Sequence, residues 1–115
     1  MDKTRKRLEN AIDAGDIRTV RGILMDIVTE RPGRADSLDS IRYAMSKAKG
    51  LFEPDTAPFC QLPREQWTQS YARDLAEATR RNFSLRNFEA LVEVQTAMSR
   101  SPREFRKAEV AEAAR

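Results

Sequence analysis

Residues 17–30 read IRTVRGILMDIVTE, and their apolar side chains recur every three or four positions. This period places the apolar side chains on one face of a helix, which can then pack against a core. Asp16 stands directly before the stretch, where its carboxylate can accept hydrogen bonds from free backbone amides. The residues RPG follow at 31–33, and the proline stops a regular helix. The stretch therefore predicts an amphipathic helix over 17–30, with Leu24 in the core.

Similar apolar stripes lie on both sides of this helix. They predict further helices over 2–14, 37–49, 63–82 and 85–99, and a capping-box sequence predicts another over 102–114. No segment alternates apolar and polar residues over the length of a strand. The sequence therefore predicts one all-α domain over 1–115, a compact bundle of five to six helices.

The outer helices differ in how much apolar surface they offer to a core. The helix over 102–114 has a thin apolar face, so we expect it to be frayed or loosely docked. In the other helices the stripes predict inward-facing side chains at Leu8, Ile41, Met45, Leu75, Leu85 and Phe88.

Residues 51–62, LFEPDTAPFCQL, form the largest apolar cluster outside the predicted helices. The prolines within and after the cluster predict an irregular segment instead of a helix. Its aromatic side chains, with two from the following helix, could line a ligand pocket or peptide groove or simply belong to the core. Cys60 in this segment is either a buried thiol or a reactive one. The candidate groove residues are Phe52, Phe59, Trp67 and Tyr71.

A short pattern recurs three times along the chain: an aliphatic residue, two further residues and an alanine. The copies begin at Leu8, Ile41 and Leu75, 33 and 34 residues apart, a period typical of stacked helical hairpins. The first copy, LENAIDAGDIRTV, resembles the two-helix part of an ankyrin repeat. The resemblance implies stacked helical hairpins with a binding surface. The prolines of residues 51–62 interrupt the second copy, and the Thr-Pro-Leu-His opening of ankyrin repeats is absent, so no family is assigned.

The composition excludes several common chemistries. The chain of 115 residues contains no His, which rules out Ser-His and Cys-His dyads and, with a single Cys, a zinc site. Its four glycines are scattered and form no phosphate-binding loop. We therefore assign no catalytic, metal or cofactor-binding residue and expect no cofactor. The lone cysteine and the lack of a long apolar run predict a cytoplasmic protein that does not enter a membrane.

Three pairs of carboxylates at helical spacing keep an enzyme as the weakest alternative. In a catalytic pair one carboxylate must be desolvated so that its pKa rises, but Asp26 and Glu30 lie off the apolar stripe, and Asp74 and Glu77 lie among arginines. We interpret them as solvated faces and predict that the protein is not an enzyme. The pairs are Asp13 with Asp16, Asp26 with Glu30, and Asp74 with Glu77.

The 21 basic and 18 acidic residues give a net charge of +3, and most of the basic residues are Arg. We expect a non-enzymatic module that binds another protein or a second copy of itself. The alternative is a nucleic-acid-binding protein, because four basic residues near the C-terminus fall close to one helical face. Pro102 and Glu104 interrupt that face. The candidate phosphate-contacting residues are Arg100, Arg103, Arg106 and Lys107.

Overall fold

The computed structural model describes residues 3–56, 59 and 61–106. Within these ranges the chain forms five α-helices and one short 3-10 helix. The one β-type pairing among the described residues is an isolated parallel bridge between Glu53 and Ser84. The predicted all-α bundle is therefore confirmed. The elements are α1 (Lys3–Asp13), α2 (Ile17–Glu30), α3 (Ala35–Lys47), η1 (Arg64–Gln66), α4 (Gln69–Arg81) and α5 (Leu85–Arg100).

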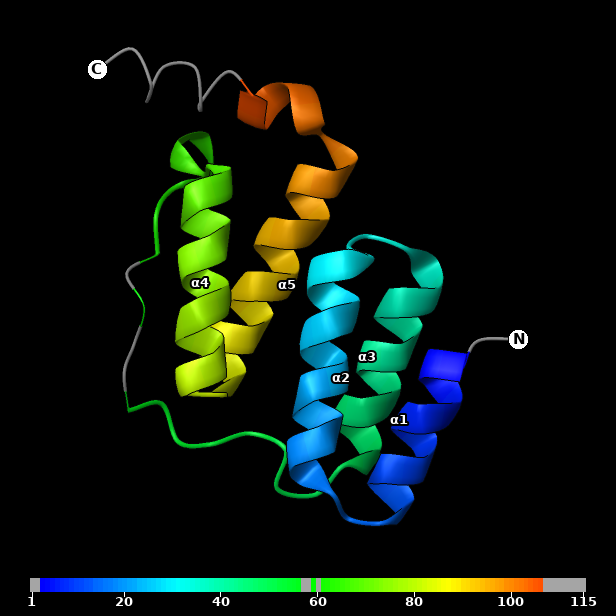
Figure 1. The fold of residues 1–115 in the computed structure, drawn as a ribbon. Coiled ribbons are helices and arrows are strands. Elements are labelled where there is room, and N and C mark those ends of the chain that lie inside the picture. Colours follow the sequence, from blue (N-terminus) through cyan, green and yellow to red (C-terminus); the bar gives the residue numbers. More distant parts are fainter. Residues whose placement is uncertain (1–2, 57–58, 60, 107–115) are drawn as a thin grey trace.

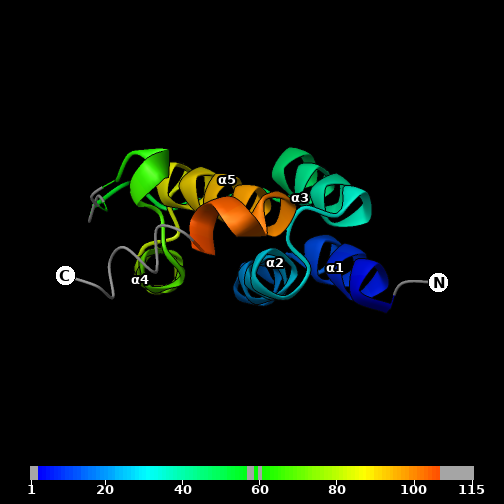
Figure 2. The ribbon, with the colours of Figure 1, turned by 90° about the horizontal axis from the view of Figure 1, so that it is seen from above.

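The helices form a flat, two-layered molecule. Helices α1, α2 and α3 alternate in direction, so that α2 runs antiparallel to both α1 and α3, and the α4–α5 hairpin lies beside them (Figure 1). Seen from above, α3 and α5 form one layer and α1, α2 and α4 the other (Figure 2). The principal extents of 49 × 35 × 16 Å reflect this slab. Helix α2 contacts all four other α-helices, so it is the centre of the fold.

Helix α2 has the bounds and the buried face that the sequence predicts. The Asp16 carboxylate caps it, accepting hydrogen bonds from the backbone N–H of Thr19 at 3.3 Å and from its hydroxyl at 2.6 Å. Leu24 is fully buried. Burial of such an aliphatic side chain contributes roughly 1.5–3 kcal/mol, so the α2 stripe supplies much of the stability of the fold.

Two predicted inward-facing residues are wrong: the side chains of Met45 and Leu85 are 38% and 43% exposed. Helix α3 packs through small residues, Ser37, Ser40 and Ala44, and this face turns Met45 toward solvent. Leu85 is the first residue of α5, where the fully buried Asn87 and Phe88 face the core instead.

The start of α4 also differs from the sequence-based prediction. The helix begins at Gln69 and not at position 63, because the Thr68 hydroxyl caps it by accepting from the Tyr71 N–H at 3.1 Å. Helix η1 precedes it, and Trp67 lies in extended backbone between the two elements. Trp67 therefore does not share a helical face with Tyr71, contrary to the sequence-based prediction that both lie on one helix.

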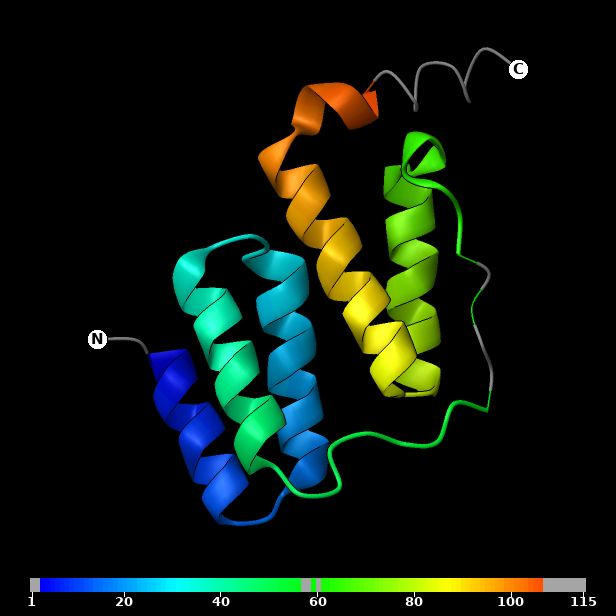
Figure 3. The same cartoon turned by 180° about the vertical axis from the view of Figure 1, so that it is seen from behind.

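Residues 48–63, which we call the connector, lead from α3 to η1 and contain no helix in their described part (Figure 3). The irregular segment predicted over 51–62 lies within the connector, because α3 ends earlier and α4 begins later than predicted. The connector is bound to the corner between α4 and α5. The Glu53 N–H donates to the Phe83 carbonyl and the Phe83 N–H to the Glu53 carboxylate, both at 2.8 Å. The Asn82 side chain donates to the Pro54 carbonyl at 2.9 Å. These bonds satisfy backbone groups that a helix or sheet would otherwise pair.

The chain turns after α5 and is helical again over residues 102–106. Phe105 is buried and stacks on Trp67, with ring centroids 6.0 Å apart. Arg64 pairs with Glu104 at 3.1 Å on the same side. The rest of the predicted C-terminal helix lies outside the described residues. No helix in the described part of the chain combines the length and apolar character needed to cross a membrane.

Candidate functional site

The four predicted groove residues do not come together in one groove. Their ring contacts divide them into three groups: Phe52 with Phe83 and Phe88, Phe59 with Tyr71, and Trp67 with Phe105. The first two groups attach the connector to the α4–α5 hairpin, and the third joins the segment before α4 to the helical turn after α5.

Trp67 and Tyr71 hold the connector by its backbone at Leu62. The Trp67 Nε1–H donates to the Leu62 carbonyl at 2.8 Å, and the Leu62 N–H donates to the Tyr71 hydroxyl at 3.2 Å. Trp67 and Tyr71 are only 7% and 8% exposed, so little of either ring is open to a ligand. Their position supports a structural role, the simpler of the two interpretations of this aromatic cluster.

The C-terminal basic residues do not form one continuous helical face either. Helix α5 ends at Arg100, whose Nη2 donates to the Gly33 carbonyl at 3.3 Å. Arg103 and Arg106 are exposed on the next helical segment, beyond the cap residue Ser101. Lys107 and Cys60 lie outside the described residues.

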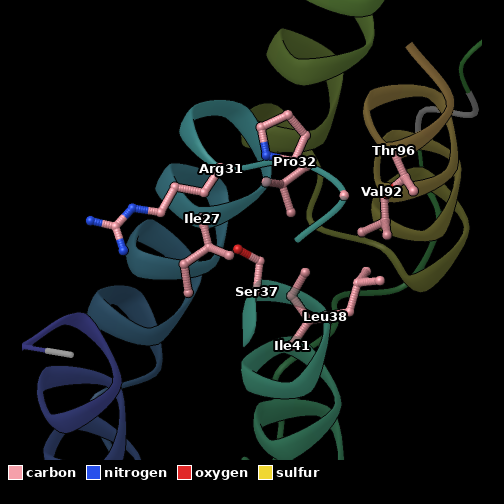
Figure 4. A pocket seen from close by; sticks show the side chains of 10 residues that line it. Ile27, Arg31, Pro32, Ser37, Leu38, Ile41, Val92 and Thr96 are labelled. Atoms are coloured by element: carbon pink, nitrogen blue, oxygen red, sulfur yellow. The ribbon is translucent and has the colours of Figure 1, made fainter. Parts of the chain in front are cut away.

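A small apolar crevice lies where the turn between α2 and α3 meets α5 (Figure 4). Its volume of about 10 Å³ has room for no more than about one water molecule. Ile27 and Leu38 point into it from the two helices, while the guanidinium of Arg31 points away (Figure 4). This crevice is a gap in the packing and is too small for an organic ligand.

A larger depression is lined by residues of α2 and of the end of α4, and the start of α2 and this end of α4 lie in the lower part of Figure 1. It is open to solvent and has a volume of about 450 Å³. We call it the arginine depression, because four of its nine lining residues are arginines. The lining residues are Arg18, Arg21, Gly22, Met25, Asp26, Glu53, Arg80, Arg81 and Phe83.

Arg21 is held in place by the connector. Its Nε donates to the Leu51 carbonyl at 2.8 Å and its Nη2 to the Gly50 carbonyl at 3.2 Å. The guanidinium also lies over the Phe83 ring, 5.6 Å from the centroid. Two hydrogen bonds and one ring contact fix the side chain before any ligand arrives, which lowers the entropic cost of binding.

The other three arginines are less constrained. Arg80 pairs with Glu77 one turn earlier on α4, at 2.7 Å on the exposed surface. Arg18 acts on the Asp16 carboxyl. The hydrogen bonds from the Thr19 side chain and backbone hold the pKa of that carboxyl below its ordinary value, and the charge of Arg18 adds a smaller effect in the same direction. Arg81 ends α4 and is exposed, at the helix end where positive charge is favoured.

The depression has an excess of positive charge. Four arginines and two acidic residues line it; Arg80 also pairs with Glu77 outside the lining, and the Glu53 carboxylate already accepts the Phe83 N–H. Guanidinium groups bind carboxylates and phosphates through two parallel hydrogen bonds. The geometry therefore suits an anionic ligand. Among the described residues, no group of three or more acidic or cysteine side chains is placed to hold a metal ion.

Sequence reasoning missed this site because its arginines come from helices about 60 positions apart. On the sequence, Arg18 and Arg21 are ordinary polar-face residues, and Arg80 and Arg81 seem to belong with the C-terminal basic region. In the structure they lie at the opposite end of the α4–α5 hairpin from Arg100 (Figure 1). The one available signal was Gly22, a glycine inside a strongly predicted helix.

No protein-family model matches the chain, and no curated protein or solved structure is significantly similar to it. The assignment of function therefore depends on the geometry of the arginine depression.

Proposed function

We propose that the protein is a non-enzymatic interaction module that binds an acidic segment of a partner protein in the arginine depression. The observation that carries the proposal is the convergence of four arginines, from α2 and α4, on one open depression. Carboxylate side chains of the partner form charge-assisted hydrogen bonds with these guanidinium groups.

The size and shape of the depression agree with a peptide segment. Its volume of about 450 Å³ lies within the range of roughly 300–1,000 Å³ that is typical of ligand sites. It is open along the edge of the slab, so an extended chain can enter and leave it. Met25 and Phe83 form its buried floor, so the surface open to a ligand is mainly that of the arginines and Gly22.

The charges favour a protein partner over a nucleic acid. Asp26 and Glu53 stand among the four arginines and would repel a continuous line of phosphates. The net charge of the whole chain is only +3, which provides little long-range attraction for a polyanion. In the described part of the C-terminal region, α5 ends between Arg100 and Arg103, so these residues form no extended basic track that could compensate.

The proposal can be tested by NMR titration with a capped octapeptide of alternating Gly and Glu. We expect amide shifts centred on the arginine depression, and an affinity that weakens as salt is raised. Replacing Arg18 and Arg81 by Ser removes two charge-assisted contacts and should weaken binding about tenfold or more. The control variant replaces Arg42 and Arg73, two exposed arginines outside the depression, by Ser. It makes the same change in net charge and should leave the affinity nearly unchanged.

Two outcomes would contradict the proposal. Equal weakening by both double variants would show that only net charge matters. Tighter binding of a uridine oligonucleotide, with the slope of log affinity against log salt falling by about 0.7 for each of Arg100, Arg103 and Arg106 replaced, would favour nucleic-acid binding instead.

A further inference from the structure

Gly22 is the one glycine of the four whose presence neither the backbone nor the packing explains. Gly15, Gly33 and Gly50 have positive φ angles of 70°, 76° and 70°, which favour glycine over other residues. Gly22 lies inside α2 and is not among the positive-φ glycines. A Cβ atom built on Gly22 meets no atom within 4 Å beyond its chain neighbours and the adjacent backbone of α2. The fold therefore has room for a side chain at this position.

A glycine inside a helix lowers the stability of the helix, because it adds backbone freedom to the unfolded chain. In the described part of the chain no close contact at Gly22 compensates for this loss, since no neighbouring segment approaches the missing Cβ. The space above Gly22 is part of the arginine depression. The missing side chain therefore leaves the backbone of α2 accessible on the wall of the depression.

The neighbours of Gly22 are the residues that the proposed function uses. Arg18 lies one turn before it on the same face of α2, and Arg21 lies directly beside it. Arg81 lines the depression from the end of α4. A ligand that rests on the α2 backbone at Gly22 is thus placed between arginines of two helices.

We infer that Gly22 forms a notch that seats the main chain of the partner segment, so that its carboxylates reach Arg18 and Arg81 together. The inference rests on the proposed function and specifies its ligand: an extended acidic segment with glycine or another small residue facing Gly22. A side chain at position 22 would hold the segment away from α2 and lengthen every contact with the arginines. Gly22 is therefore the residue that determines specificity for small side chains.

The experiment compares two peptide probes and three variants. The probes are capped octapeptides of alternating Gly and Glu and of alternating Val and Glu, which have equal charge. Wild type should bind the Gly probe several-fold more tightly than the Val probe. Gly22→Leu should weaken the Gly probe about tenfold and remove the difference between the probes, while Gly22→Ala should have an intermediate effect.

The thermal midpoint separates lost binding from lost folding. Gly22→Leu and Gly22→Ala should both melt at or above the wild-type temperature, because Leu and Ala are better helix formers than Gly. Ser70→Leu is the matched control, since it adds the same side chain to an exposed position at the other end of α4. It should bind both probes as wild type does.

The inference and the proposed function fail in different ways. If Gly22→Leu binds the Gly probe as tightly as wild type while replacement of Arg18 and Arg81 abolishes binding, the notch is overturned and the proposed function stands. If the arginine replacements leave the affinity unchanged, the proposed function fails and the inference fails with it.

Discussion

The arginine depression and the C-terminal basic region contain the same type of residue in opposite arrangements. Arg18 and Arg81 are far apart in the sequence but line one depression. Arg100 and Arg103 are near neighbours in the sequence, yet α5 ends between them. Helix ends and helix packing therefore decide which charges converge, and closeness in the sequence does not.

The two regions also differ in how firmly their arginines are held. The guanidinium of Arg21 donates to two backbone carbonyls of the connector and lies over the Phe83 ring. The guanidinium of Arg100 makes one exposed hydrogen bond to the Gly33 carbonyl. A fixed cation loses less conformational freedom on binding than a mobile one, so Arg21 is better prepared to bind an anion than Arg100.

The largest expected effect comes from removing Phe83, the aromatic side chain beneath Arg21. Phe83 is 3% exposed and contacts the rings of Phe52 and Phe88 as well as Arg21. Phe83→Ala should lower the free energy of unfolding by about 3–5 kcal/mol, because it leaves a cavity at the corner between α4 and α5. Urea denaturation measures this loss.

Leu85→Ala is the control for Phe83→Ala, since Leu85 lies two residues away and is 43% exposed. Its cost should stay within about 0.5 kcal/mol, as for most surface substitutions. Comparable losses from both substitutions would show that the corner is not packed around Phe83.

The helices could be predicted from the sequence because their apolar stripes are local patterns. The stripe and cap of α2 needed only the residues from Asp16 to Pro32. The errors occurred where polar residues take apolar positions. Ser37 and Ser40 are 5% exposed and pack α3 closely against its neighbours, which leaves Met45 outside. A hydrophobicity pattern cannot detect a buried serine.

The site could not be predicted because it depends on the path of the connector. Asn82 accepts a hydrogen bond from the Thr56 N–H and donates to the Pro54 carbonyl, and these two bonds help fix the connector to the corner of the hairpin. From there the connector presents its Leu51 carbonyl to Arg21. No spacing rule links these positions, since each contact follows from the tertiary packing of the others.

A second prediction tests the difference in anchoring directly. Arg21→Ala should lower the free energy of unfolding by about 2 kcal/mol, because it leaves two carbonyls of the connector without their charged donor. Arg100→Ala removes one exposed hydrogen bond and should cost less than about 1 kcal/mol. Chemical denaturation of wild type and the two variants under one set of conditions measures both losses in the free energy of unfolding.

Arg21→Lys sharpens this second prediction. A lysine keeps the charge but lacks the planar fork that bonds two carbonyls at once. We expect Arg21→Lys to have a free energy of unfolding between those of wild type and Arg21→Ala. An Arg21→Lys protein as stable as wild type would show that charge alone holds the connector.

The smallest expected effect concerns Asp16, the cap of the helix that carries Arg18 and Arg21. Its pKa lies below the ordinary value because of the hydrogen bonds from the Thr19 side chain and backbone, with a smaller contribution from the charge of Arg18. A depressed carboxyl pKa means that the folded state binds the proton less tightly than the unfolded state does. The ionised cap therefore stabilises the fold above the unfolded-state pKa, and this contribution is lost as the pH falls through the lower, folded-state pKa. Carboxyl carbon NMR titration should show the pKa of Asp16 rising most in Thr19→Val, less in Arg18→Ser, and not at all in Arg100→Ser. Arg100 ends α5 and donates to Gly33, which follows the C-terminal end of α2, far from Asp16. A shift in Arg100→Ser as large as that in Arg18→Ser would mean that the arginines act through the overall charge of the chain, and the depression would lose its distinct local field.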